Sequence, residues 1–171
     1  MKHYIRIIAL GLSAIAFAQT EDHSGQIRKG AGDVGAALLA GNYGTVLDLT
    51  YPAIVEIMGG REEALGVIEK QMTVIREKGI SLTSYKVGDP SEIKAGGSEL
   101  FAAIPTTLEM KAPQTKIVAH SYLVAVSSDQ GKSWFYADGS NLTPELMNTV
   151  FPKFPKELKL PEKSNVVEKI P

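Results

Sequence analysis

The sequence contains no cysteine among its 171 residues. A chain without thiols forms neither disulfides nor thiolate metal sites, and it offers no cysteine nucleophile and no N-terminal cysteine for lipidation. The fold must therefore be stabilised by its hydrophobic core, which a domain of about 150 residues can supply by burying roughly two-thirds of its unfolded surface.

Motifs for metals, cofactors and nucleophilic catalysis are also missing. Apart from His3, the histidines are His23 and His120, which do not form the helical pair typical of zinc sites. The glycines at residues 30–35 follow no predicted strand and have the wrong spacing for a dinucleotide fingerprint. There is no Gly-x-Ser-x-Gly elbow and no phosphate loop. We therefore expect no metal and no cofactor.

Neither sign of charge is in excess. The chain has 18 Lys and Arg residues and 19 Asp and Glu residues, which gives a formal net charge of −1. Removal of residues 1–18 takes away Lys2 and Arg6 but no acidic residue, and the charge becomes −3. A mildly acidic surface disfavours nucleic acid and anionic membranes as partners.

The N-terminus has the three parts of a secretory signal peptide. A basic segment precedes an apolar run at residues 7–17, and Ala16-Phe17-Ala18 supplies the small residues of a cleavage site before Gln19. The apolar run is shorter than a membrane span. We expect residues 1–18 to be a signal peptide and the mature protein to be periplasmic or extracellular, with no membrane segment.

Residues 19–151 have the pattern of one domain, and its first half is helical. A first helix begins near Ile27 and ends at Gly41, and a short one follows at residues 43–49. Pro52 ends that helix and starts the next, because proline has a fixed φ and biases the preceding residue away from helix.

The longest predicted helix covers residues 61–78. Its apolar residues recur at spacings of three and four and form a single stripe, which we expect to pack against the strands that follow. The stripe consists of Leu65, Ile68, Met72 and Ile75.

From residue 80 the apolar period changes to two, which predicts an antiparallel meander. Pro105 requires an edge position or a bulge, whereas the strand at residues 116–126 is apolar on both faces and needs cover on both. The predicted strands are residues 80–87, 92–95, 100–111, 116–126 and 132–137, and a short helix follows up to residue 150.

Residues 152–171 form a C-terminal tail with four prolines and five lysines. This composition favours an extended strap that becomes loose towards its end.

Helices followed by an antiparallel meander predict an α+β fold, in which the N-terminal helices cover one face of a curved sheet. The last turn leaves two registers open. A two-residue loop pairs Val124 with Phe135, whereas a three-residue loop pairs Val124 with Tyr136 and places Trp134 and Tyr136 beside Tyr122.

Tyr51-Pro52 and Gly59-Gly60-Arg61-Glu62 lie between predicted helices, and the segment Lys-Ser-Trp-Phe-Tyr-Ala-Asp-Gly at residues 132–139 ends the meander. In this order of elements the chain resembles the nuclear transport factor 2-like (NTF2-like), or SnoaL-like, superfamily, in particular small secreted bacterial members with no assigned activity. The resemblance covers most of the mature chain and implies a cystatin-like cone with a pocket between helices and sheet. The superfamily includes dehydratases, isomerases, cyclases and non-catalytic binders, and fold alone does not fix function.

His120 shares one face of the central predicted strand with Val118, Tyr122 and Val124. On a pocket face it could act as an acid or base near neutral pH, with Tyr122 as a hydrogen-bond donor. We favour the alternative of a buried or interface histidine, because neither a carboxylate nor a nucleophile lies at a diagnostic spacing.

Asp48 and Glu56 flank Tyr51, and both could point toward the mouth of a pocket. Isomerases of the superfamily use a base carboxylate that faces an oxyanion hole of tyrosine and protonated acid, as in ketosteroid isomerase. No acid stands among the inward positions of the central strand here. Solvated helix positions or caps are therefore the favoured interpretation.

Trp134 and Tyr136 are the strongest aromatic pair, and core packing is the default for Trp134, with ligand stacking as the alternative. We assign no catalytic residue. The candidate pocket residues are Tyr51, Glu56, His120, Tyr122, Trp134 and Tyr136.

Two functions remain as hypotheses. The first is an exported, non-catalytic domain that binds a small apolar ligand or a protein, with a homodimer through the sheet as one arrangement, because both faces of residues 116–126 need cover. The second is an enzyme of isomerase, dehydratase or cyclase type that uses His120 with Tyr122 or Glu56. We favour the first.

Overall fold

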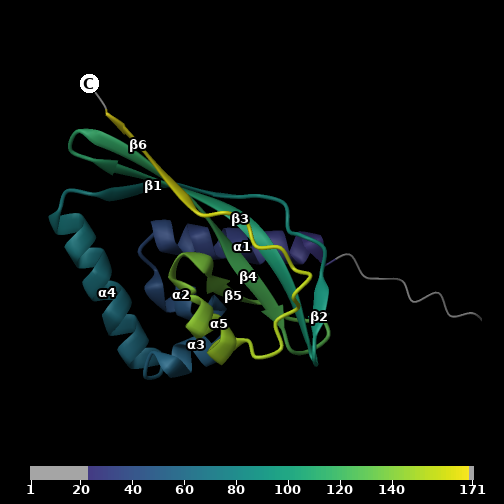
Figure 1. The fold of residues 1–171 in the computed structure, drawn as a ribbon. Coiled ribbons are helices and arrows are strands. Elements are labelled where there is room, and N and C mark those ends of the chain that lie inside the picture. The colour runs from purple at the N-terminus through teal and green to yellow at the C-terminus, as the bar shows by residue number, and fades with distance from the viewer. Residues whose placement is uncertain (1–22, 170–171) are drawn as a thin grey trace, which may run out of the picture.

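The structure, a computed structural model, describes residues 23–169 and shows an α+β fold (Figure 1). The predicted signal peptide at residues 1–18 lies outside the described residues. The helices are α1 (Ser24–Leu39), α2 (Tyr43–Leu49), α3 (Pro52–Ile57), α4 (Arg61–Glu77) and α5 (Pro144–Val150), with a 3-10 turn at Gly139–Asn141. The strands are β1 (Ser81–Val87), β2 (Lys94–Gly96), β3 (Glu99–Ala112), β4 (Thr115–Ser127), β5 (Phe135–Asp138) and β6 (Ser164–Lys169). This order confirms the predicted helices followed by an antiparallel sheet.

The sheet has the order β1-β3-β4-β5, with β2 beside β3 and β6 beside β4. Two different strands pair with the same edge of β4: residues 123–126 pair with β5, and residues 115–120 pair with β6. We call these the proximal and distal parts of the sheet. Figure 1 shows that the distal part extends beyond the helices that cover the proximal part.

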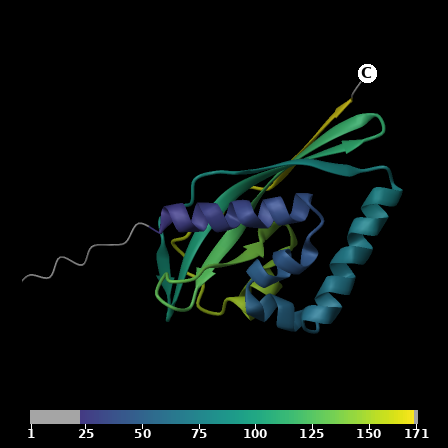
Figure 2. The same ribbon diagram turned by 180° about the vertical axis from the view of Figure 1, so that it is seen from behind.

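The proximal sheet is buried on both faces, whereas the sequence predicted helices on one face only. Helix α1 lies across one face, as the reverse view shows (Figure 2). Its core cluster comprises Ile27, Ala31, Val34, Ala102, Ile104, Leu123, Ala125, Trp134 and Tyr136. The other face packs against α3, α5 and the C-terminal tail. Its cluster comprises Phe101, Ala103, Tyr122, Val124, Val126, Ala137, Leu142, Val150, Phe151 and Leu158.

The longest helix, α4, does not cover the sheet as predicted. Ala64 is its buried residue, and its main contacts are with α2 and α3. The predicted stripe, represented by Ile68 and Met72, remains half-buried. The physical reason is that α1 already occupies that sheet face, and α4 stands at the side of the molecule (Figures 1 and 2).

Pro105 lies in β3 without disrupting the sheet. Its carbonyl oxygen accepts a hydrogen bond of 2.8 Å from the Gly88 amide. The ladder of β1 ends where Val87 pairs with Thr106, and β2 pairs only from Phe101 toward the start of β3. β3 is therefore an interior strand rather than the predicted edge strand, and it tolerates proline because Pro105 lies in the gap between its two partner strands β1 and β2.

The hairpin between β4 and β5 has neither of the two predicted registers. Val124 pairs with Ala137. This register places Trp134 and Tyr136 on the α1 face of the sheet, away from Tyr122, which belongs to the opposite core cluster.

A side-chain cap explains why the loop is longer than predicted. The Asp129 carboxylate accepts hydrogen bonds from the Ser127 hydroxyl (2.8 Å) and from the Ser133 amide (2.9 Å) and hydroxyl. The bonds from Ser133 are the main reason that the pKa of Asp129 falls to about 2. Gln130 and Gly131 have φ values of 63° and 91°, which turn the chain within this cap.

The C-terminal tail docks on the sheet. Leu158 is buried in the core cluster opposite α1, and Phe154 and Leu160 pack against that cluster. The end of the tail, which the sequence predicted to be loose, forms β6 instead. The tail therefore contributes both to the proximal core and to the distal sheet.

Candidate functional site

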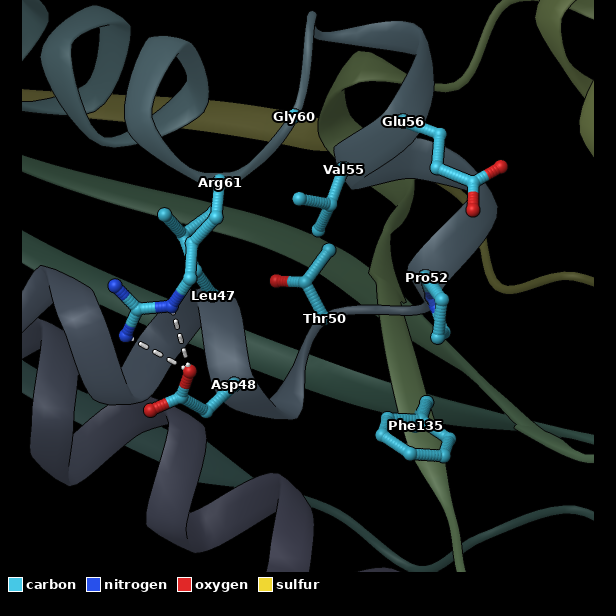
Figure 3. Close-up of a pocket in the computed structure, with 9 residues that line it drawn as sticks. All are labelled: Leu47, Asp48, Thr50, Pro52, Val55, Glu56, Gly60, Arg61 and Phe135. Atoms are coloured by element: carbon cyan, nitrogen blue, oxygen red, sulfur yellow. Dashed lines mark hydrogen bonds and ion pairs between the residues drawn. The ribbon is translucent and has the colours of Figure 1, made fainter.

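A groove forms where α2, α3 and the start of α4 meet beside β5 (Figure 3). The groove has a volume of about 310 Å³ and is open to solvent. This is the lower end of the range for small-ligand sites, which is roughly 300–1,000 Å³. The groove is lined by Leu47, Asp48, Thr50, Pro52, Val55, Glu56, Gly60, Arg61 and Phe135.

Backbone pairing with the edge of β5 positions the floor of the groove. Thr50 forms a parallel bridge with Tyr136, and the Tyr51 amide donates to the Tyr136 carbonyl oxygen over 2.9 Å. Pro52 then starts α3, as its fixed φ predicts. The joint between α2 and α3 therefore lies directly beside Phe135.

The rim of the groove carries an ion pair. The Arg61 Nε and Nη2 atoms lie 3.1 and 2.9 Å from Asp48 Oδ1, and Nη2 also lies 3.4 Å from the Gly44 carbonyl oxygen. Gly59 and Gly60 have φ values of 97° and 95°, a conformation that glycine adopts without strain, and they turn the chain so that Arg61 starts α4 beside α2.

The groove carries three charged side chains, Asp48, Glu56 and Arg61. Asp48 is occupied by the Arg61 guanidinium, and Glu56 lies on another side of the groove, exposed to solvent (Figure 3). Asp48 and Glu56 thus line the same groove, although the histidine and the tyrosines predicted as candidates do not.

The Tyr51 side chain links the joint between α2 and α3 to the start of β3. Its hydroxyl donates to Glu99 Oε1 over 2.6 Å, and the Ser128 hydroxyl donates to the same oxygen over 3.0 Å. Burial, followed by the hydrogen bond and the charge of Glu99, raises the pKa of Tyr51 to about 12. The hydroxyl therefore stays neutral near pH 7 and acts as a structural donor.

His120 and Tyr122 share a face of β4 but lie in different environments. Tyr122 is 5% exposed within the core, and burial, followed by the charge of Asp138, raises its pKa. His120 is exposed, and its Nδ1 lies 3.1 Å from the Thr107 hydroxyl. Neither residue lines the groove that contains Glu56. The structure therefore does not bring His120 together with Tyr122 or Glu56 in one cavity, as catalysis by these residues would require.

Trp134 and Tyr136 anchor the α1 face of the core. The Trp134 indole donates to the Gly131 carbonyl oxygen (3.1 Å), and the Tyr136 hydroxyl donates to the Ile27 carbonyl oxygen (3.0 Å). Burial, followed by the charge of Asp33, raises the pKa of Tyr136 to about 12. Both aromatic residues border a second shallow groove of about 250 Å³ between α1 and the β4–β5 hairpin.

Local sequence patterns do not identify the apolar lining of the groove. The Tyr51-Pro52 and Gly59-Gly60-Arg61 signals marked the helical joint, but they did not show which distant residue completes it. Phe135 does so from β5, and no local pattern could have placed it there because its position depends on the register of the β4–β5 hairpin.

Among residues 23–169, no set of three or more histidine, aspartate or glutamate side chains is placed to hold a metal ion. None of the helices in this part of the chain combines the length and the hydropathy of a membrane span. Comparison of the sequence with protein-family models and curated proteins, and of the fold with solved structures, finds no match.

Proposed function

We propose that the chain is an exported, non-catalytic binding domain that receives an apolar group of a small ligand or of a partner protein in the groove between α2, α3 and β5. The observation that carries this proposal is an apolar floor of Leu47, Val55 and Phe135 beneath a rim whose cation is already paired. Such a floor gains free energy by excluding water from an apolar group, at about 25 cal/mol per Å² buried.

The test is an amide NMR titration with three six-carbon probes that differ in charge: hexanol, hexanoate and hexylammonium. We expect hexanol to shift the amide signals of Leu47, Val55 and Phe135. The Val55→Asp variant should abolish these shifts, because a carboxylate in the floor must remain solvated.

Val67→Asp is the matched control. Val67 is 43% exposed on α4, outside the groove lining, and its replacement should leave the titration unchanged. Shifts that spread over the surface, or that survive in Val55→Asp, would show that the groove is not the binding site.

Export to the periplasm or the medium is part of the same proposal, and the basic segment, apolar run and small residues of residues 1–18 support it. Mass spectrometry of protein recovered from the exported fraction of a bacterial host should find an N-terminus at Gln19. An uncleaved chain that remains in the cytoplasm would contradict it.

We also propose a relationship to the nuclear transport factor 2-like superfamily, which the order of helices and meander supports. Burial of the proximal sheet on both faces departs from the cone with helices on one face that the resemblance implied. Superposition of a crystal structure of this chain on solved members of the superfamily tests the relationship. The strand order β1-β3-β4-β5 with α1 packed on the same sheet face as the first helix of those members would support it, and a different strand order in those members would contradict it.

A further inference from the structure

The last strand, β6, is attached to the sheet without burying side chains. Its six residues pair with residues 115–120 of β4, yet every one of them is exposed. The side chains of Val166 and Val167 are 45% and 62% exposed to solvent. Backbone hydrogen bonds along the β4 edge therefore hold β6, with little contribution from hydrophobic packing.

The anchoring of the tail ends before β6 begins. Leu158 is buried and Leu160 packs against the core, but no residue of β6 belongs to either core cluster. The paired residues 115–120 of β4 are likewise outside both clusters. Separation of β6 from β4 would thus leave the core intact and expose a strand edge, which is a template for pairing with another segment.

The vacated edge would have a defined chemical preference. In the present register Val167 lies opposite Ile117, Val166 opposite Val118, and Glu168 opposite Lys116. Two apolar residues followed by an acid therefore match this edge.

Positive charge around the edge strengthens the preference for an acid. Glu109 lies 3.0 Å from the Lys86 ammonium and 2.9 Å from the Lys116 ammonium, and this single carboxylate serves two cations. Lys111 adds a third cation on β3. An incoming acidic residue opposite Lys116 would balance this excess, as Glu168 does in the chain itself.

We propose that residues 115–120 of β4 form a strand-accepting site, which β6 occupies as a built-in competitor. The external occupant is an extended segment of a partner protein that carries two adjacent apolar residues followed by an acidic one, and it replaces β6 by strand exchange. This mode of recognition combines main-chain hydrogen bonds for affinity with alternate side chains for specificity. The site is separate from the α2–α3 groove and does not depend on its function.

The test uses the full chain with β6 disabled by a double substitution, Val166→Pro and Val167→Pro, because proline cannot donate to a strand ladder. The probe is a labelled synthetic peptide with the sequence of residues 162–169. We expect the double-proline variant to bind it at least about tenfold more tightly than the unmodified chain does, since tethered β6 competes at a high effective concentration.

Two controls distinguish strand exchange from non-specific binding of the peptide. A Val166→Thr, Val167→Thr chain keeps β propensity and should bind the peptide no better than the unmodified chain. A peptide with the Glu168→Lys change should bind the double-proline variant roughly tenfold more weakly than the original peptide, because it places a cation opposite Lys116. Equal binding of the two peptides would overturn the proposal, and so would equal binding by the proline and threonine variants.

Hydrogen exchange of the unmodified chain tests the premise without any substitution. The β6 amides should exchange at least about a hundredfold faster than those of β5, because opening of β6 uncovers no core. Equal protection of the two strands would overturn the proposal.

A concentration-dependent dimer that exchanges β6 between copies would assign the edge to a second copy and would also overturn it. The Val55→Asp variant should leave peptide binding unchanged, which distinguishes this site from the groove.

Discussion

The two strands that share one edge of β4 are held by different forces. β5 pairs with residues 123–126, and Tyr136 and Ala137 within it are 3% and 0% exposed. β6 pairs with residues 115–120, and all six of its residues are exposed. The same ladder geometry therefore supports a permanent element of the core in the proximal sheet and a replaceable element in the distal sheet.

The difference originates in the layers around the sheet rather than in the sheet itself. Helix α1 covers one face of the proximal part, and α5 with the tail covers the other. Backbone hydrogen bonds contribute modestly to net stability because water offers equivalent bonds, whereas burial of apolar side chains contributes the larger share. Stability should consequently fall from the proximal to the distal sheet.

The largest expected contrast comes from truncation of core and distal side chains. Phe101 is fully buried in β3, with its ring edge-on to Phe151 and Phe154, and Phe101→Ala should cost about 3–5 kcal/mol of unfolding free energy. Ile117 in the distal part of β4 is only half-buried, and Ile117→Ala should cost below about 1 kcal/mol. Urea unfolding measures both, and equal costs would remove the distinction between the two parts.

A smaller contrast is expected between two glycines of α1. A Cβ at Gly30 would overlap the Tyr136 hydroxyl, which is fixed by its bond to the Ile27 carbonyl. Gly30→Ala should therefore destabilise the fold by about 1–3 kcal/mol.

Gly32 has no atom within 4 Å of the same added group, and Gly32→Ala should stabilise the helix by about 0.5–1 kcal/mol. Thermal unfolding of both variants gives the comparison. If Gly30→Ala stabilised the fold as much as Gly32→Ala, α1 would not pack against Tyr136 of β5 as closely as the structure shows.

The pH dependence of stability tests the buried hydroxyl of β5. The folded-state pKa of Tyr136 is raised from about 10 to about 12. Its stabilising contribution is therefore complete below pH 10 and is lost as the pH rises from 10 to 12.

Tyr136→Phe should cost about 1 kcal/mol at pH 7 through the lost hydrogen bond, and it should flatten the decline between pH 10 and 12. Urea midpoints measured across that range supply the test. An unchanged alkaline slope would mean that Tyr136 does not remain protonated in the fold as its burial requires.

The smallest effect is expected on β6 itself. Val167 is 62% exposed, and Val167→Ala should change the unfolding free energy by no more than about 0.5 kcal/mol. Val124→Ala, at a fully buried position of β4, is the matched control and should cost clearly more. A large effect of Val167→Ala would show that β6 belongs to the cooperative core.

Local patterns predicted most elements within a few residues. The short helix at residues 43–49 coincides with α2, and Pro52 and Gly59-Gly60 delimit α3 as proline and glycine chemistry requires. Local patterns also predicted α4 at residues 61–78, but they did not predict its packing, because an apolar stripe shows that a helix has a face to bury but not which surface remains available. The candidate residues failed to converge for a related reason: Trp134 and Tyr122 lie on opposite faces once the register of the hairpin is known.

By itself, the sequence determined the α+β class, the order of the elements and the helical joint at Tyr51-Pro52, because these follow from side-chain period and backbone chemistry. It also predicted that residues 116–126 need cover on both faces, which holds for the proximal part of β4 but not for residues 115–120, which belong to neither core cluster. Only the tertiary structure decided that α1 and the tail supply that cover, that Phe135 completes the groove, and that β6 remains exposed. These outcomes depend on contacts between residues far apart in the chain, and such contacts are selected by competition for the same surfaces rather than by local preference.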